Sequence, residues 1–209
     1  MKLLFLGDSI TDAGRYREED GGLSSYGCGF VRSIAGRLFS RDPGKYAVVN
    51  RGVSADKTVD LYARLKPDVW NEKPDVLTVL VGINDLAFDI KKNTGVGRER
   101  FKKVYRAILE ETLEVLPKIR ILLAEPFMGH GRETDGFFPE FEEISSYAAV
   151  VKELAAESGA VFVPLSAALE EGERKYGAGS MLSDGVHPTV AGAERIADEW
   201  MKAFEKIEK

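Results

Sequence analysis

The chain is short of the residues that form disulfide bonds and bind transition metals. Its 209 residues include one cysteine and two histidines. An intramolecular disulfide is therefore impossible, and a zinc site built from several cysteines and histidines is excluded. The single cysteine, Cys28, has no histidine near it in the sequence and is expected to be a small buried thiol. We expect neither a metal ion nor an organic cofactor.

Long apolar runs and an excess of positive charge are also missing. No stretch approaches the length of about 20 apolar residues that spans a bilayer. The apolar run at residues 3–6 is too short for the core of a signal peptide. The net charge is −5, whereas nucleic acid normally selects for a basic face. The sequence predicts a cytoplasmic protein that binds neither membranes nor nucleic acid, and it leaves open whether the chain forms a homo-oligomer.

What the sequence does contain is a regular alternation of apolar runs and helical segments. The runs are nearly continuous rather than alternating, as expected of strands that are covered on both faces, and they occupy residues 3–6, 46–49, 76–81, 119–124 and 161–163. Helical periodicity occupies residues 30–39, 58–65, 98–116 and 144–158, and one further stripe comprises Ala193, Ile196, Ala197, Trp200, Met201 and Phe204. We predict one domain over residues 1–209 with an α/β fold: a three-layer αβα sandwich around a flavodoxin-like, five-stranded parallel sheet.

Polar residues follow the carboxyl ends of these predicted strands. Ser9 follows the first strand, Ala55 the second and Asn84 the third. Asp184 and His187 come after the fifth. Ligands of open α/β sheets bind outside the carboxyl ends of the strands. We therefore expect all five residues at one edge of the sheet.

Three of these residues have the chemistry of a nucleophile, a base and an acid. A serine hydroxyl reacts only when a base takes its proton, and the base needs a carboxylate to fix its tautomer. At a spacing of three on a loop, the Asp184 carboxylate can reach Nδ1 of His187 and leave Nε2 for Ser9. Each residue also has a simpler interpretation: Ser9 as a helix N-cap, and the other two as a turn aspartate and a surface histidine.

Two segments can supply hydrogen-bond donors to a developing oxyanion. The Asn84 amide can donate, as can the backbone N–H of Ser9, although Gly-Ile-Asn-Asp at residues 82–85 is also typical of a strand-end turn. Residues 50–56, with the sequence Asn-Arg-Gly-Val-Ser-Ala-Asp, end the second strand and can offer a third donor from the backbone.

Three blocks together resemble the SGNH (GDSL) hydrolase superfamily. They are Gly-Asp-Ser-Ile-Thr at residues 7–11, Gly-Ile-Asn-Asp at residues 82–85 and Asp-Gly-Val-His-Pro at residues 184–188. Their order and approximate spacing are those of the family, and the resemblance extends from residue 3 to about residue 200. It implies that Ser9 is the nucleophile, His187 the base and Asp184 its orienting acid.

The same resemblance implies an oxyanion hole formed by Asn84 and the backbone N–H groups of Ser9 and Ala55. Ala55 stands where the family usually has glycine. Only the backbone N–H is required of this residue, so alanine can serve if its φ and ψ angles allow. Gly52 is the alternative donor and is more simply a turn glycine.

Within the superfamily, the chain resembles bacterial carbohydrate acetylesterases, including acetylxylan esterases. The resemblance rests on Gly-Asp-Ser-Ile-Thr-Asp-Ala-Gly-Arg from residue 7 and Tyr-Gly-x-Gly-Phe from residue 26. It implies a serine esterase that removes short acyl groups, expected to be acetyl, from small-molecule or oligosaccharide esters through an acyl-enzyme on Ser9. A lysophospholipase, a thioesterase or a lipase-like enzyme is the alternative within the family, and a non-catalytic flavodoxin-like binding module is the alternative outside it.

Five further residues are candidates for contact with the substrate at the same edge of the sheet. They are Asp8, Arg15, Tyr26, Phe127 and His130. Asp8 precedes Ser9, Arg15 and Tyr26 lie in the segment after it, and the last two lie in the loop after the fourth strand. Phe127 can line a sugar-binding wall or merely pack its loop, and we do not expect His130 to be a second catalytic base.

Overall fold

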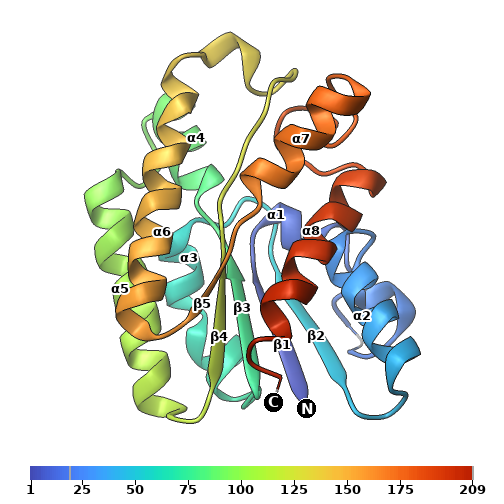
Figure 1. Ribbon diagram of the computed structural model, residues 1–209. Helices are drawn as coiled ribbons and strands as arrows, with labels where there is room; N and C mark the ends of the chain where they lie inside the picture. The colour runs from blue at the N-terminus through green and yellow to red at the C-terminus, as the bar shows by residue number, and fades with distance from the viewer. Residues whose placement is uncertain (19, 209) are drawn as a thin grey trace.

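One parallel sheet organises the chain, whose computed structural model describes residues 1–18 and 20–208. The strand order is β2-β1-β3-β4-β5 (Figure 1). Every neighbouring pair of strands is parallel, so the carboxyl ends all meet at one edge. The predicted α/β fold is therefore confirmed. The strands are β1 (Lys2–Gly7), β2 (Ala47–Gly52), β3 (Val76–Leu80), β4 (Arg120–Ala124) and β5 (Val161–Val163).

Helices cover both faces of the sheet and give the predicted three layers (Figure 1). Helices α2 and α8 pack together on one face, while α3, α5 and α6 cover the other. The helices are α1 (Ser9–Asp12), α2 (Phe30–Arg41), α3 (Thr58–Ala63), α4 (Ile83–Lys92), α5 (Arg98–Val115), α6 (Ile144–Ser158), α7 (Ser166–Tyr176) and α8 (Val190–Phe204). Single turns of other helix types connect them: η1 (Leu23–Tyr26), η2 (Lys66–Trp70), η3 (Asp135–Phe137) and η4 (Glu140–Glu143).

The central strands are almost entirely apolar because helices bury them from both sides. No residue of Leu3–Leu6 or of β3 is more than 2% exposed. Helix α8 presents its apolar stripe to the sheet, and the ring of Trp200 packs 5.4 Å from that of Phe5. Trp200 Nε1 also donates to Thr78 Oγ1 at 2.9 Å, which satisfies a polar side chain within a buried strand.

The structure differs from the sequence predictions in three places. Strand β2 continues past residue 49 to Gly52, since buried Asn50 finds partners inside the fold. Helices α4 and α7 were not predicted, because each is short and rich in charged residues. Cys28 is exposed rather than buried, with its Sγ donating to the carbonyl oxygen of Ala13 at 3.0 Å. Over residues 1–18 and 20–208, no helix has both the length and the apolar character needed to cross a bilayer.

Candidate active site

Ser9, His187 and Asp184 form a continuous chain of hydrogen bonds at the carboxyl edge of the sheet. Ser9 Oγ lies 2.9 Å from His187 Nε2, and His187 Nδ1 lies 2.8 Å from Asp184 Oδ2. With a proton on Nδ1, the imidazole donates to the carboxylate and leaves Nε2 to accept from the serine hydroxyl. The His187 side chain is 45% exposed and that of Asp184 is 14% exposed, so a substrate can approach the histidine while the carboxylate stays sheltered.

A tight turn holds Asp184 against His187. Asp184 Oδ1 accepts from the backbone N–H groups of Val186 at 3.0 Å and His187 at 2.8 Å. Burial raises the pKa of Asp184, but hydrogen bonds from the His187 backbone, the His187 ring and Val186 outweigh that effect and leave the pKa below its ordinary value. The carboxylate therefore stays charged and can stabilise an imidazolium.

The loop after β4 is hydrogen-bonded to this turn. Gly129 N–H donates to Gly185 O at 2.8 Å, and Glu133 N–H donates to Asp184 O at 2.9 Å. Gly185 has a φ of +94°, and a side chain there would collide with Thr134. The glycine in Asp-Gly-Val-His is thus required both by its backbone conformation and by the close approach of the neighbouring loop.

Ser9 is placed by the sharp turn from β1 into α1. Asp8 caps the helix, with its Oδ1 accepting from Ile10 N–H at 2.9 Å. The Ser9 N–H lies in the first turn, where backbone N–H groups have no partner within the helix. A side chain at Gly7 would meet Thr11 Oγ1 and the carbonyl oxygen of Leu80, so glycine is needed for β1 to pass its neighbours before the turn.

Asp8 itself faces the interior, contrary to the prediction that it contacts substrate. The residue is 0% exposed, and its Oδ2 has no hydrogen-bond partner among the described residues. Burial raises the pKa of Asp8 to about 7. Sequence adjacency to Ser9 suggested a site residue, whereas the helix-capping geometry turns the side chain inward.

Ala55 occupies a turn in which glycine would be the preferred residue. The turn is closed by Asp56 N–H donating to Val53 O at 3.2 Å, and Ala55 has a φ of +72°. A positive φ at the second central position of a turn is the usual reason for glycine there. The Ala55 N–H is not used by the turn. The alternative donor, Gly52, is excluded because its N–H donates to Asn50 Oδ1 at 2.8 Å and the residue is buried.

Asn84 lies in the first turn of α4, directly after β3, and is partly exposed. One of its amide hydrogens is used, since Nδ2 donates to Asp56 O at 3.1 Å. That bond links the Asn84 side chain to the turn that contains Ala55. Because β1 lies between β2 and β3, the segments that carry Ser9, Ala55 and Asn84 end three adjacent strands.

Of the four other residues predicted to contact substrate, one is packed in the interior and three lie near the site. Tyr26 is 7% exposed, its hydroxyl donates to Gly21 O, and its ring packs against Phe39, so the prediction that it contacts substrate is wrong. Arg15 is half-buried, and its Nε donates to Gly52 O at 2.8 Å, which sets the guanidinium against the end of β2. Its contact with substrate stays a prediction.

Phe127 and His130 line a cavity of about 220 Å³ between the loop after β4 and helix α7. Leu182, also in the lining, pairs with Pro188 beside His187, so the cavity borders the turn that carries the histidine. The His130 ring stacks on Phe138 at 4.3 Å, and its Nδ1 lies 3.0 Å from Asp135 Oδ1. His130 is thus engaged within its own loop.

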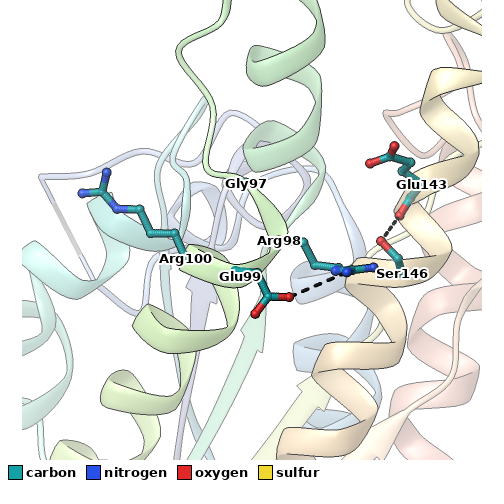
Figure 2. A pocket seen from close by; sticks show the side chains of 6 residues that line it. All are labelled: Gly97, Arg98, Glu99, Arg100, Glu143 and Ser146. Atoms are coloured by element: carbon teal, nitrogen blue, oxygen red, sulfur yellow. Dashed lines mark hydrogen bonds and ion pairs between the residues drawn. The ribbon is translucent and has the colours of Figure 1, made fainter.

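A larger groove, of about 640 Å³, lies between the N-terminal ends of α5 and α6 (Figure 2). Two interactions join residues of the lining: Arg98 lies 3.6 Å from Glu99, and Ser146 Oγ donates to the backbone oxygen of Glu143 at 2.7 Å. None of the residues that line it belongs to the Ser9–His187–Asp184 chain. Within the described residues, no group of three or more His, Cys, Asp or Glu side chains is arranged to hold a metal ion.

Sequence reasoning missed four buried or half-buried residues that hold the site together. Asp12 and Asp85 are buried carboxylates next to the motif residues, and Arg64 joins Asp56 to the carbonyl oxygen of Gly7. Asn50 donates from its amide to the carbonyl oxygens of Thr11 and Tyr26. Polar residues inside otherwise apolar blocks were the available signal. Their partners lie 8 to 57 positions away, and the sequence pattern does not show which residues pair.

Comparison with known proteins gives consistent matches over nearly the whole chain. A model of the GDSL-like lipase/acylhydrolase family matches residues 5–195. An acetylxylan esterase from Geobacillus stearothermophilus is 35% identical over 208 residues, which cover 96% of this chain and 92% of that protein.

Two solved structures extend the comparison to three dimensions. A Parabacteroides merdae protein described as a GDSL-like lipase matches with a TM-score of 0.90 and 31% identity, over 98% of this chain and 95% of its own. A structure of an acetylxylan esterase from Geobacillus stearothermophilus matches with a TM-score of 0.86 and 35% identity, over 97% of this chain and 93% of its own.

Proposed function

Because the chain belongs to the GDSL-like lipase/acylhydrolase family and is a carboxylic ester hydrolase, we propose that it removes acetyl groups from carbohydrate esters through an acyl-enzyme on Ser9. The resemblance to the superfamily is confirmed. The observation that carries the proposal is the pair of hydrogen bonds that join Ser9 Oγ to His187 Nε2 and His187 Nδ1 to Asp184 Oδ2. That sequence of contacts is the arrangement a serine nucleophile requires.

In the proposed mechanism, Ser9 Oγ attacks the ester carbonyl carbon while His187 Nε2 takes the hydroxyl proton. When the tetrahedral intermediate collapses, the ester oxygen leaves and takes the proton from His187, so the sugar departs with a free hydroxyl. A water molecule then gives a proton to His187 and attacks the acyl-enzyme. When this second intermediate collapses, acetate leaves and His187 passes the proton to Ser9 Oγ, which restores the hydroxyl. Asp184 stabilises the imidazolium in both halves of the reaction.

The negative charge on the carbonyl oxygen needs donors that are already in place. We propose the Ser9 N–H, the Asn84 side-chain amide and the Ala55 N–H for this role. Support comes from the free N–H in the first turn of α1, from the second amide hydrogen of Asn84 and from the Ala55 N–H that the turn does not use. Fixed donors of this kind stabilise the transition state more than the ground state.

The proposed substrate class is acetylated oligosaccharides, in line with the acetylxylan esterase that is 35% identical. The decisive assay incubates the purified protein with acetylated xylo-oligosaccharides and, separately, with other acetylated sugars, and measures free acetate. Ser9→Ala should abolish release, whereas Ser145→Ala, which changes an exposed helix serine, should not. Full activity in a folded Ser9→Ala protein would overturn the mechanism.

The alternative within the family is a lysophospholipase, thioesterase or lipase-like activity on longer acyl groups. Rates on p-nitrophenyl acetate, butyrate and octanoate separate the two, and preference for octanoate would favour the alternative. A non-catalytic binding module would leave Ser9 unlabelled by an active-site phosphonate, which mass spectrometry of the intact protein detects.

We also propose that the enzyme works in the cytoplasm on imported oligosaccharides, and that residues 1–209 fold as one domain. The exposed free thiol of Cys28 is more compatible with a reducing compartment than with an oxidising one. Cell fractionation tests the location. Light scattering of the purified protein tests whether it forms a homo-oligomer.

A further inference from the structure

The loop between β2 and α3, residues 53–57, is held from both ends by buried carboxylates. We propose that Asp12 and Asp85 are positioning residues that fix the backbone of Ala55, so that its N–H points at the oxyanion formed during ester hydrolysis. The inference rests on the proposed function, because it assigns a task to the N–H only if Ser9 is the nucleophile. Neither carboxylate touches the reacting atoms in this role.

Asp12 holds the first part of the loop. Its side chain is buried, and Oδ2 accepts from the Ser54 N–H at 3.0 Å and the Ser54 hydroxyl at 3.3 Å. Asp12 belongs to α1, the short helix that Ser9 begins, and its own N–H donates to Asp8 O at 2.8 Å. The residue before Ala55 is therefore tied to the same helical turn that carries the nucleophile.

Asp85 holds the far end of the loop, where α3 begins. It is 0% exposed, and its carboxylate accepts from the Thr58 N–H at 3.1 and 3.2 Å and from the Thr58 hydroxyl. The neighbouring Asn84 amide donates to Asp56 O. The residue after Ala55 and the first residue of α3 are thus tied to the start of α4, which carries another proposed oxyanion donor.

Arg64 joins the loop itself to the strand before Ser9. Its Nε donates to Asp56 Oδ2 at 2.7 Å, and a terminal nitrogen donates to Gly7 O at 3.1 Å. A shift of residues 53–57 relative to Ser9 would therefore break hydrogen bonds to three different elements, β1, α1 and α4.

Ala55 needs such support because its conformation is unfavourable. A φ of +72° is uncommon for a residue with a Cβ, and the residue is exposed, so packing does little to hold it. Two carboxylates are buried next to the loop at a desolvation cost that hydrogen-bond and ion-pair partners offset, and Asp12 also pairs with Arg17. The Asp85 carboxylate accepts from the N–H and the hydroxyl of Thr58, which directly follows the loop. The Asp12 carboxylate accepts from the N–H and the hydroxyl of Ser54 within the loop.

The test removes one anchor without touching the proposed catalytic groups. Thr58→Val keeps the shape of the side chain and deletes the hydroxyl that donates to Asp85. A loosened Ala55 N–H should lower kcat on p-nitrophenyl acetate by about ten- to a hundredfold, with KM unchanged within about twofold, since the donor acts in the transition state. Thr58→Ser restores the hydroxyl and should recover most of kcat.

Thr112→Val is the matched control. Thr112 is also 0% exposed, and its hydroxyl oxygen accepts from Trp70 Nε1 at 3.2 Å, away from the loop. This variant should lose a comparable amount of thermal stability and keep its kcat. Equal loss of kcat in Thr58→Val and Thr112→Val, or an unchanged kcat in Thr58→Val, would overturn the inference.

Asp12→Asn tests the other anchor independently and replaces Thr58→Val if that variant does not fold. It should lower kcat with little change in KM. It should also weaken, by a similar factor, the binding of a trifluoromethyl ketone, whose hemiketal adduct with Ser9 carries the oxyanion. Unchanged affinity for this inhibitor would contradict the role of Asp12. Labelling of Ser9 by a phosphonate, measured first in the unaltered protein, separates failure of the positioning role from failure of the proposed function.

Discussion

The buried carboxyl group of Asp8 makes the stability of the fold depend on pH, and Asp8→Asn should remove that dependence. Asp8 is 0% exposed, and burial raises its pKa from 3.8 to about 7. Between these two pH values the folded protein holds a proton on Asp8 that the unfolded chain has released. The free energy of unfolding therefore falls as pH rises through this interval. Above about pH 7, Asp8 is ionised in both states and makes no further contribution to the fall.

The size of the effect follows from the width of the interval. Each pH unit corresponds to about 1.4 kcal/mol for a group that is protonated in one state only. Asparagine keeps an oxygen for the Ile10 N–H and is as good an N-cap as aspartate. It is neutral at every pH, so the stability of Asp8→Asn relative to the unaltered protein should increase by on the order of 3 kcal/mol from pH 5 to pH 8.

Urea unfolding at pH 5 and pH 8, followed by circular dichroism, measures the difference directly. Asp85, whose pKa burial raises to about 6, is present in both proteins and titrates in both. Asp42→Asn, at an exposed position, controls for the loss of one negative charge without a change in burial. If the two proteins differed by the same free energy at both pH values, the reasoning about Asp8 would be refuted.

Three further predictions concern the proposed oxyanion donors and the cysteine. Asn84→Ala should lower kcat on p-nitrophenyl acetate by about 10²–10³-fold with little change in KM. A raised KM at constant kcat would instead show that Asn84 binds the substrate and the transition state equally well. Ala55→Gly relieves the positive φ and, after allowance for the entropy of glycine, should raise the free energy of unfolding by about 0.5–1 kcal/mol; a lower thermal midpoint would contradict this strain. Cys28 should react with Ellman's reagent in the native protein, and Cys28→Ser should keep full esterase activity, which an essential thiol would not allow.

The positions of the central strands were predictable because a strand that is buried on both faces consists almost entirely of apolar residues. Strands β1 and β3 are nearly continuous apolar runs, and their positions agree with the prediction to within one residue. Strand β2 was predicted too short, since Asn50 and Arg51 interrupt the apolar run. Asn50 and Arg51 make hydrogen bonds to distant segments, and these bonds allow the strand to continue. The local sequence pattern does not reveal such bonds.

The candidate site was predictable for the residues that lie in short sequence motifs with distinctive side chains. Ser9, Asp184 and His187 are brought within hydrogen-bonding distance, and their catalytic roles remain a prediction for the proposed assays to test. Nearness to Ser9 in the sequence was a poor guide to nearness in space. Asp8 and Tyr26 were expected at the substrate and are instead packed inside.

The sequence by itself determined the class of fold and the candidates for the reactive groups, because apolar periodicity and a few chemically distinctive side chains are local properties. Only the tertiary structure decided which side chains face the substrate edge and which are buried beneath it. It also decided that Asp12 and Asp85 hold the loop around Ala55. Those outcomes depend on hydrogen bonds between segments 27 to 42 positions apart, and the bonds exist only once the sheet has brought the ends of its strands together.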